Sequence, residues 1–231
     1  EHYTALVAGT EPPAPRFAPV EPVVREEESY RESDAFAADR AFWADYLADV
    51  EEAVALSPGA SGIARRSRAV RFTLDAQQQN ALAALGKSAR GSWGDAVTAL
   101  VAAYLRGATG RDDITIGFPV MNRLGSAALN VPMTAVNVVP LRLRPAARDS
   151  LSGLVGQVRD SVARCRKHYR YRGEDIQRDL RLPAGSRGVI GPSVNVKPFG
   201  DRFRFADITA AVHSIARGPL QDFMITVRPL D

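Results

Sequence analysis

Apolar residues recur every three or four positions in four stretches of the chain, and this period predicts amphipathic helices. Each stretch follows a residue that commonly caps a helix: Ser33, Asp75, Ser92 and Ser150. The helices are expected over residues 33–49, 76–90, 92–107 and 150–162, and a shorter one over 173–181. Asp95, three residues after Ser92, approximates a capping box, and Gly107 is expected to end that helix.

Strands are expected where β-branched and aromatic residues alternate with polar ones or form short apolar runs. The predicted strands cover 70–74, 112–120, 133–144, 189–197, 205–214 and 222–228. Pro140 lacks a backbone donor, so its strand should lie at a sheet edge or carry a bulge there. The order of helices and strands predicts an α/β fold with a mixed sheet covered by helices.

Two segments lack either period. Prolines at 12, 13, 15, 19 and 22 indicate an extended connector over residues 10–25. Residues 57–67 are rich in Gly, Ser and Arg and are expected to form a loop.

Composition narrows the class of protein. The chain has 231 residues, 45% of them hydrophobic and 24% charged, which is typical of a globular protein. No window reaches the roughly 18 apolar residues of a membrane span. The first 20 residues do not resemble a signal peptide and begin in mid-pattern, as if inside a larger protein. One cysteine, Cys165, excludes an internal disulfide and fits the cytoplasm.

The net charge of +4 is unevenly distributed. Residues 1–52 are acidic, whereas Arg and Lys outnumber Asp and Glu by more than two to one over 142–187. This asymmetry fits either two solvated faces of opposite sign or a docking surface for an acidic partner. The basic segment lacks the interleaved aromatic residues of single-stranded nucleic-acid binders, so nucleic acid is not the expected partner.

Candidate catalytic chemistry is sparse. The three histidines, His2, His168 and His213, show no metal-ligand spacing, and no metal site is expected. His168 is interpreted as a favourable cation at a helix C-terminus. No Gly-x-Ser-x-Gly elbow and no glycine-rich phosphate loop occur, and Cys165 is interpreted as a buried small hydrophobe.

The segment TGRDDITIGFPVMNR (109–123) resembles the corresponding segment of condensation domains in nonribosomal peptide synthetases, where a Gly-x-Asp-Asp turn leads into a strand ending in Asn-Arg. Further segments are similar to that family in the same order: HYTALVAGTEPPAP (2–15), AFWADYL (41–47), VPMTAVNVVPLRL (131–143) and HYRYRGEDIQRDL (168–180). The last of these departs from the family's usual His-Gln-Asp-x-Pro-Phe-Glu run. It looks like the variant of serine-type siderophore synthetases, as do GPSVNVKPFG (191–200) and ARGPLQDFMITVRP (216–229).

The resemblance implies two chloramphenicol acetyltransferase-like lobes. Residues 1–32 would be the end of the N-terminal lobe and the connector, and residues 33–231 the C-terminal lobe. It also implies a reaction in which the amine of one carrier-bound aminoacyl thioester attacks an acyl or peptidyl thioester on another carrier. The implied partners are these carrier proteins with their 4'-phosphopantetheine arms, adjacent synthetase domains and the missing N-terminal lobe. No cofactor is expected to be bound by the chain itself.

The family's catalytic motif, His-His-x-x-x-Asp-Gly, does not occur in the sequence. No catalytic residue is therefore assigned, and the isolated chain is expected to be inactive. Two alternatives stay open: a non-catalytic module of the same fold that recruits partner proteins, and an epimerisation or acyltransferase relative.

The resemblance assigns supporting roles to a few residues. Arg123 corresponds to the arginine that pairs with the motif aspartate, so in this chain it should be solvated or borrow another acid. Asn137, Ser193 and Asn195 are expected to line the tunnel, and the alternative interpretation of Asn137 and Asn195 is that they are buried structural amides. The segment from Gly218 to Asp222 is expected to bridge the lobes.

Overall fold

A computed structural model describes residues 1–14, 16–57, 67–182, 186–198, 202–211 and 222–229 of the chain. The helices are α1 (His2–Val7), α2 (Glu21–Arg31), α3 (Asp34–Tyr46), α4 (Ala76–Ser88), α5 (Trp93–Thr109), α6 (Leu151–Cys165) and α7 (Gly173–Asp179), with short 3-10 turns η1 (Ala127–Asn130) and η2 (Arg166–His168). The strands are β1 (Ile114–Met121), β2 (Val136–Leu143), β3 (Ser193–Val196), β4 (Arg202–Phe205), β5 (Ile208–Ala211) and β6 (Met224–Val227).

The main sheet has the strand order β2-β1-β3-β6. β1 and β2 are antiparallel, whereas β1–β3 and β3–β6 are parallel, so the predicted mixed sheet is confirmed. Pro140 lies in β2 at the edge of this sheet and pairs with Gly117 in an unbroken register. The prediction of an edge position is therefore confirmed, and no bulge was needed.

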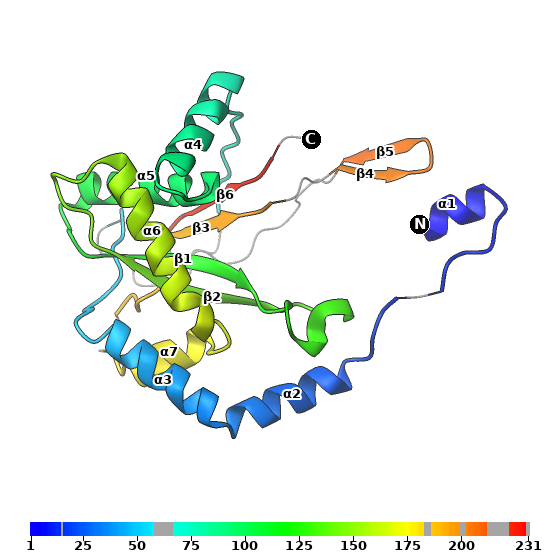
Figure 1. Cartoon of the computed structure of the whole chain (residues 1–231), viewed down its shortest axis with the longest axis horizontal. Helices are drawn as coiled ribbons and strands as arrows, with labels where there is room; N and C mark the ends of the chain where they lie inside the picture. The colour runs from blue at the N-terminus through cyan, green and yellow to red at the C-terminus, as the bar shows by residue number, and fades with distance from the viewer. Residues whose placement is uncertain (15, 58–66, 183–185, 199–201, 212–221, 230–231) are drawn as a thin grey trace.

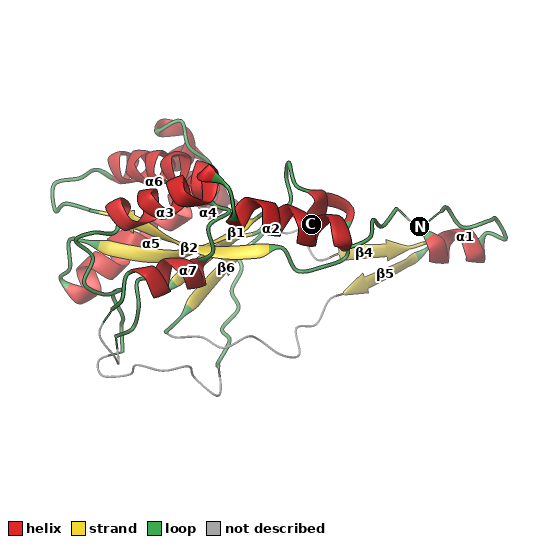
Figure 2. Cartoon of the chain, turned by 90° about the horizontal axis from the view of Figure 1, so that it is seen from below, coloured by secondary structure: helices red, strands yellow, loops and turns green. Residues whose placement is uncertain are grey.

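The core lies between this sheet and its helices. Alternate residues of β1 and β2, such as Ile114, Ile116 and Leu141, are fully buried and pack in one cluster with Val155 and Val158 of α6. Seen edge-on, the sheet has α6 on one side and α7 on the other (Figure 2). The chain therefore has the helix-covered α/β sheet that its sequence predicted.

The predicted helix caps are confirmed by hydrogen bonds. The side chains of Ser33, Asp75, Ser92 and Ser150 each accept a backbone N–H in the first turn of their helix. Ser92 and Asp95 form both bonds of a capping box.

Two helix boundaries differ from the prediction. α5 continues past Gly107 and ends at Gly110, which has a φ of 69° and so satisfies the left-handed C-terminal position that glycine favours. α2 begins inside the predicted connector, because Pro22 falls in the first helical turn, where its missing N–H is not needed.

The strand predicted over 70–74 is wrong. Among the residues that the structure describes, this segment has no strand partner, and Val70 and Phe72 are 87% and 77% exposed. Their alternating pattern is that of a strand, but a strand also needs a neighbour to satisfy its backbone groups.

A second, two-stranded sheet of β4 and β5 lies apart from the main body, beside α1 (Figure 1). Tyr3 of α1 packs edge-on against Phe205, and the backbone N–H of Ala206 donates to the Thr4 hydroxyl at 3.2 Å. The N-terminal helix therefore contacts residues about 200 positions later in the chain.

Candidate functional site

The polar residues that follow β1 donate hydrogen bonds to backbone carbonyls. The Asn122 amide donates to the Tyr169 carbonyl at 2.9 Å. The Arg123 guanidinium donates to the carbonyls of Ala128 and Val131 at 2.7 and 2.8 Å, and also to that of Met133. Arg123 therefore orders the loop that connects β1 to β2.

Arg123 was expected to be solvated or to borrow another acid, and the structure leaves it half-buried. Within the described residues its partners are three carbonyl groups and no carboxylate. A guanidinium can satisfy several carbonyls because its donors are fixed in one plane and always charged. A role in pairing with an aspartate of another segment stays a prediction.

The same loop is anchored on α2. The Glu26 carboxylate accepts the Ala127 N–H at 2.8 Å and the Ser126 hydroxyl at 3.2 Å. Arg170 lies 3.6 Å from Glu26 and stacks over the Tyr30 ring. The connector helix, the loop after the Asn-Arg pair and the segment after α6 are thus joined by one set of polar contacts.

Asn137 makes four hydrogen bonds from a site that is only 8% exposed. Its amide donates to the carbonyls of Tyr169 and Tyr171, both at 2.8 Å. Its oxygen accepts the N–H groups of Val138 at 2.9 Å and Gly173 at 3.0 Å. These contacts fit the alternative interpretation of Asn137 as a buried structural amide. They occupy both the donors and the acceptor of the side chain, so little hydrogen-bonding capacity is left for a substrate. A tunnel-lining role for Asn137 stays a prediction.

Ser193 and Asn195 lie on the opposite face of β3 from the core. Val194 between them is fully buried, and Val196 packs towards Gly94 of α5. Gly117 of β1 pairs with Ser193, and its lack of a side chain leaves room for the Ser193 hydroxyl. A Cβ at this position would lie 2.3 Å from that hydroxyl. The two polar side chains predicted to line a tunnel are thus brought together on one face.

The acidic and basic segments of the chain largely face each other. Arg170 and Arg172 pair with Glu26 and Glu27, at 3.6 and 3.1 Å. Further pairs join Arg164 to Asp45, Arg144 to Asp49 and Arg40 to Asp179. Much of the predicted docking charge is therefore neutralised inside the molecule.

His168 is not isolated at its helix end. Its Nδ1 lies 2.6 Å from an Asp39 carboxylate oxygen, and its ring stacks on Phe42. The other Asp39 oxygen accepts the Tyr30 hydroxyl at 2.6 Å, and burial together with this bond raises the pKa of Tyr30. Periodicity could not reveal the buried Asp39, because an aspartate in a helix is ordinarily solvated.

The Asp-Asp turn before β1 carries a nearly buried ion pair. Arg142 has 8% of its side chain exposed and binds Asp113 through Nε at 2.9 and 3.1 Å. Burial alone would raise the pKa of Asp113, but the hydrogen bonds and charges of Arg142 and Arg144 outweigh it and lower that pKa. This pair fixes the start of β1 against β2.

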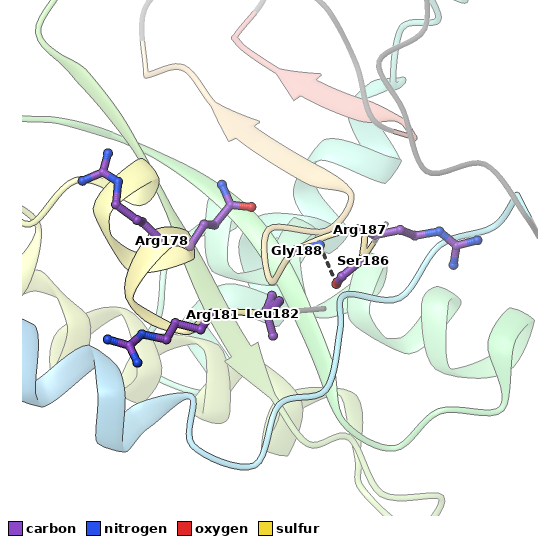
Figure 3. Close-up of a pocket in the computed structure, with 7 residues that line it drawn as sticks. Arg178, Arg181, Leu182, Ser186, Arg187 and Gly188 are labelled. Atoms are coloured by element: carbon purple, nitrogen blue, oxygen red, sulfur yellow. Dashed lines mark hydrogen bonds between the residues drawn. The ribbon is translucent and has the colours of Figure 1, made fainter. Parts of the chain in front are cut away.

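A surface hollow of about 350 Å³ is lined by Arg178, Arg181 and Arg187, among other residues. The guanidinium groups of Arg178 and Arg181 point to one side and that of Arg187 to the other (Figure 3). Arg178 is paired with Asp175, and Arg187 donates to the Ser57 carbonyl. The hollow is therefore not a convergent anion site, and none of the residues predicted from the sequence lines it.

Within the described ranges, no group of three or more His, Cys, Asp or Glu residues could hold a metal ion, and no helix has the length and apolar character to span a membrane. His213 and most of the predicted bridging segment, 218–221, lie outside these ranges. Asp222 is described, and its carboxylate accepts the Leu56 N–H at 2.7 Å.

Comparison with known proteins gives a consistent result. A family model described as "Condensation domain" matches residues 1–221. The chain is 39% identical to an isonitrile lipopeptide synthase of Streptomyces coeruleorubidus and 33% identical to enterobactin synthase component F of Escherichia coli K12, over 98% of its length in each case. It spans only 15% and 18% of those proteins.

Solved structures give the same match. The first condensation domain of the calcium-dependent antibiotic synthetase, in complex with a substrate analogue, is 32% identical and superposes with a TM-score of 0.86. The match covers 98% of this chain and 50% of that domain.

Proposed function

Because this chain belongs to the condensation-domain family of nonribosomal peptide synthetases, we propose that it takes part in forming a peptide bond between two carrier-bound thioesters. The amine nitrogen of the aminoacyl thioester attacks the carbonyl carbon of the acyl or peptidyl thioester. The C–N bond forms, the C–S bond breaks, and the amine proton is lost as the thiol leaves. The observation that carries the proposal is the TM-score of 0.86, at 32% identity, to a solved condensation domain.

The chain's own contribution is to bind and orient the substrates. We assign residues 33–231 to the C-terminal lobe, and residues 1–32 to the end of the N-terminal lobe and the connector. Arg123 supports this site by ordering the loop between β1 and β2. Ser193 and Asn195 would line a tunnel that receives the phosphopantetheine arm of a carrier protein. No general base is assigned, since the His-His-x-x-x-Asp-Gly motif does not occur in the sequence.

The test is a condensation assay with a longer protein that contains both this chain and a segment carrying the His-His-x-x-x-Asp-Gly motif. Donor and acceptor carrier proteins are loaded with thioesters, and the amide product is detected by mass spectrometry of the intact carriers. The proposal expects product with this protein and none above background with the isolated chain. If the longer protein binds carriers but forms no product, the chain is instead a recruiting module.

The carrier-protein surface can be tested separately. Arg166 and Lys167 are exposed and have no ion-pair partner among the described residues, unlike Arg170. Reversing both charges should weaken binding of an acidic carrier protein at low salt, because it removes attraction without breaking an internal contact. Arg111→Glu, at another exposed site, serves as the control. Equal carrier affinity for the double variant and the control would refute this surface. Location in the cytoplasm forms part of the proposal and rests on the single cysteine.

A further inference from the structure

Three polar side chains form a short row on the face of the main sheet that lies opposite the core. The row consists of Ser193 and Asn195 of β3 and Thr226 of β6. Asn195 pairs in register with Thr226, and register partners in a parallel sheet point to the same face. Ile225 and Val227, which alternate with Thr226, pack against the core instead. Thr226 therefore extends the face of Ser193 and Asn195 onto the next strand.

The polar groups of this row are unused by the protein. Among the described residues, no hydrogen bond engages the side chains of Ser193, Asn195 or Thr226. By contrast, Asn137 in the same sheet makes four such bonds. Two asparagines of one sheet thus differ: Asn137 is bound by backbone groups, whereas Asn195 is open to a ligand.

The chemistry of the row selects a neutral ligand that contains amides. The hydroxyl groups and the carboxamide can each donate and accept, which matches the N–H and C=O of an amide, and no charged side chain belongs to the row. Ser193 and Asn195 are separated by about 6.7 Å along the strand, and Asn195 and Thr226 by about 4.8 Å across the sheet. Met224, which pairs with Ser193 and is 42% exposed, adds an apolar surface for methylene groups.

We infer that Thr226 is a further positioning residue, and that the row Ser193–Asn195–Thr226 binds the two successive amides of a pantetheine arm. The inference rests on the proposed function for the identity of this arm. Gly117 contributes to this binding site, because a side chain at Gly117 would displace the Ser193 hydroxyl. The thiol end of the arm would then be oriented by contacts to its amides rather than by contacts to the reacting atoms.

The test is a titration of the ¹⁵N-labelled chain with free pantetheine, followed by two-dimensional NMR. Pantetheine should shift the backbone signals of residues 193–195 and 224–226 and the Asn195 side-chain amide. Thr226→Val and Asn195→Ala should each weaken binding about three- to tenfold, the loss expected for one neutral hydrogen bond. Neither side chain has a hydrogen-bond partner in the part of the chain that the structure describes, so unchanged spectra elsewhere will show that the variants remain folded.

Two controls make the outcome specific. Thr209→Val changes an exposed threonine of β5 in the other sheet and should leave pantetheine affinity unchanged. 6-Mercaptohexanol, a thiol with methylene groups but no amide, should not shift the signals of the row. Shifts confined to other residues, or equal affinity of Thr226→Val and the unmodified chain, would overturn the inference.

This experiment separates the inference from the proposed function. If the longer protein catalyses condensation but pantetheine shifts no signals of the row, the inferred binding of pantetheine by the row is refuted and the proposed function is not. Pantetheine binding at the row without any condensation product would refute the proposed reaction while leaving the binding row intact.

Discussion

Replacing Asn137 by alanine tests whether this residue is a structural tie. The substitution removes all four hydrogen bonds of the side chain and leaves the backbone groups of Gly173 and Tyr171 without this partner. A net hydrogen bond contributes about 0.5–1.5 kcal/mol, so the expected loss in the free energy of unfolding is about 2–6 kcal/mol. That is a large fraction of the stability of an ordinary domain.

Asn122→Ala is the matched comparison. It removes a single bond to the Tyr169 carbonyl, which still accepts from Asn137. The expected loss is therefore only about 0.5–1.5 kcal/mol. Asn137→Asp would keep the acceptor but place a carboxylate oxygen against two carbonyls, and it should destabilise the fold at least as much as alanine.

Urea unfolding followed by tryptophan fluorescence is a suitable assay. Trp43 is 1% exposed, and its indole N–H donates to the His168 carbonyl, next to the segment that Asn137 holds. If Asn137→Ala costs no more than Asn122→Ala, the structural interpretation is wrong. Unchanged stability combined with loss of activity in the longer protein would favour the tunnel-lining role instead.

Three other variants or conditions have defined outcomes. Asp113→Asn should cost about 1–3 kcal/mol at pH 7, less than a fully buried pair because about a third of the Asp113 side chain is exposed. Since folding lowers the pKa of Asp113, its contribution is present above the unfolded value near 3.9 and is lost as the pH falls through the folded pKa. The stability gap between the two proteins in urea should therefore shrink below pH 4, and a constant gap would contradict the assignment. Thr115→Val should stabilise the fold by about 1 kcal/mol, because the buried Thr115 hydroxyl finds no hydrogen-bond partner among the described residues. A lower unfolding midpoint would show that the hydroxyl is satisfied. Burial raises the pKa of Cys165 to about 11. A disulfide reagent at pH 8 should therefore react slowly with the native chain and rapidly with the chain unfolded in urea. Equal reaction rates would show that the thiol is not buried.

Local features of the fold were readable from the sequence because their causes are local. The caps at Ser33, Asp75, Ser92 and Ser150 depend on contacts within three residues, and all four are present. The strand over 70–74 failed because its pattern says nothing about whether a neighbouring strand is available. Periodicity describes one segment, whereas pairing depends on two.

The candidate site was only partly predictable for the same reason. Ser193 and Asn195 were found by resemblance, but Thr226 became visible only when the register placed it beside Asn195. The partners of Arg123 are carbonyl groups, which every residue carries, so no side-chain pattern could reveal them. The charge asymmetry was seen, but its internal neutralisation depends on the pairing of α2 and α3 with residues that lie far along the chain.

That internal charge pairing has a consequence for biosynthesis. The contacts between Glu27 and Arg172 and between Glu26 and Arg170 span 145 and 144 positions. At the usual rates of translation, the acidic helix α2 leaves the ribosome about 7–30 seconds before its basic partners are made. During this interval its carboxylates have no counter-charge from the later segment, so α2 should dock only after the sheet has formed. A nascent chain stalled before residue 160 should therefore leave α2 open to protease, and one stalled after the whole chain has emerged should protect it.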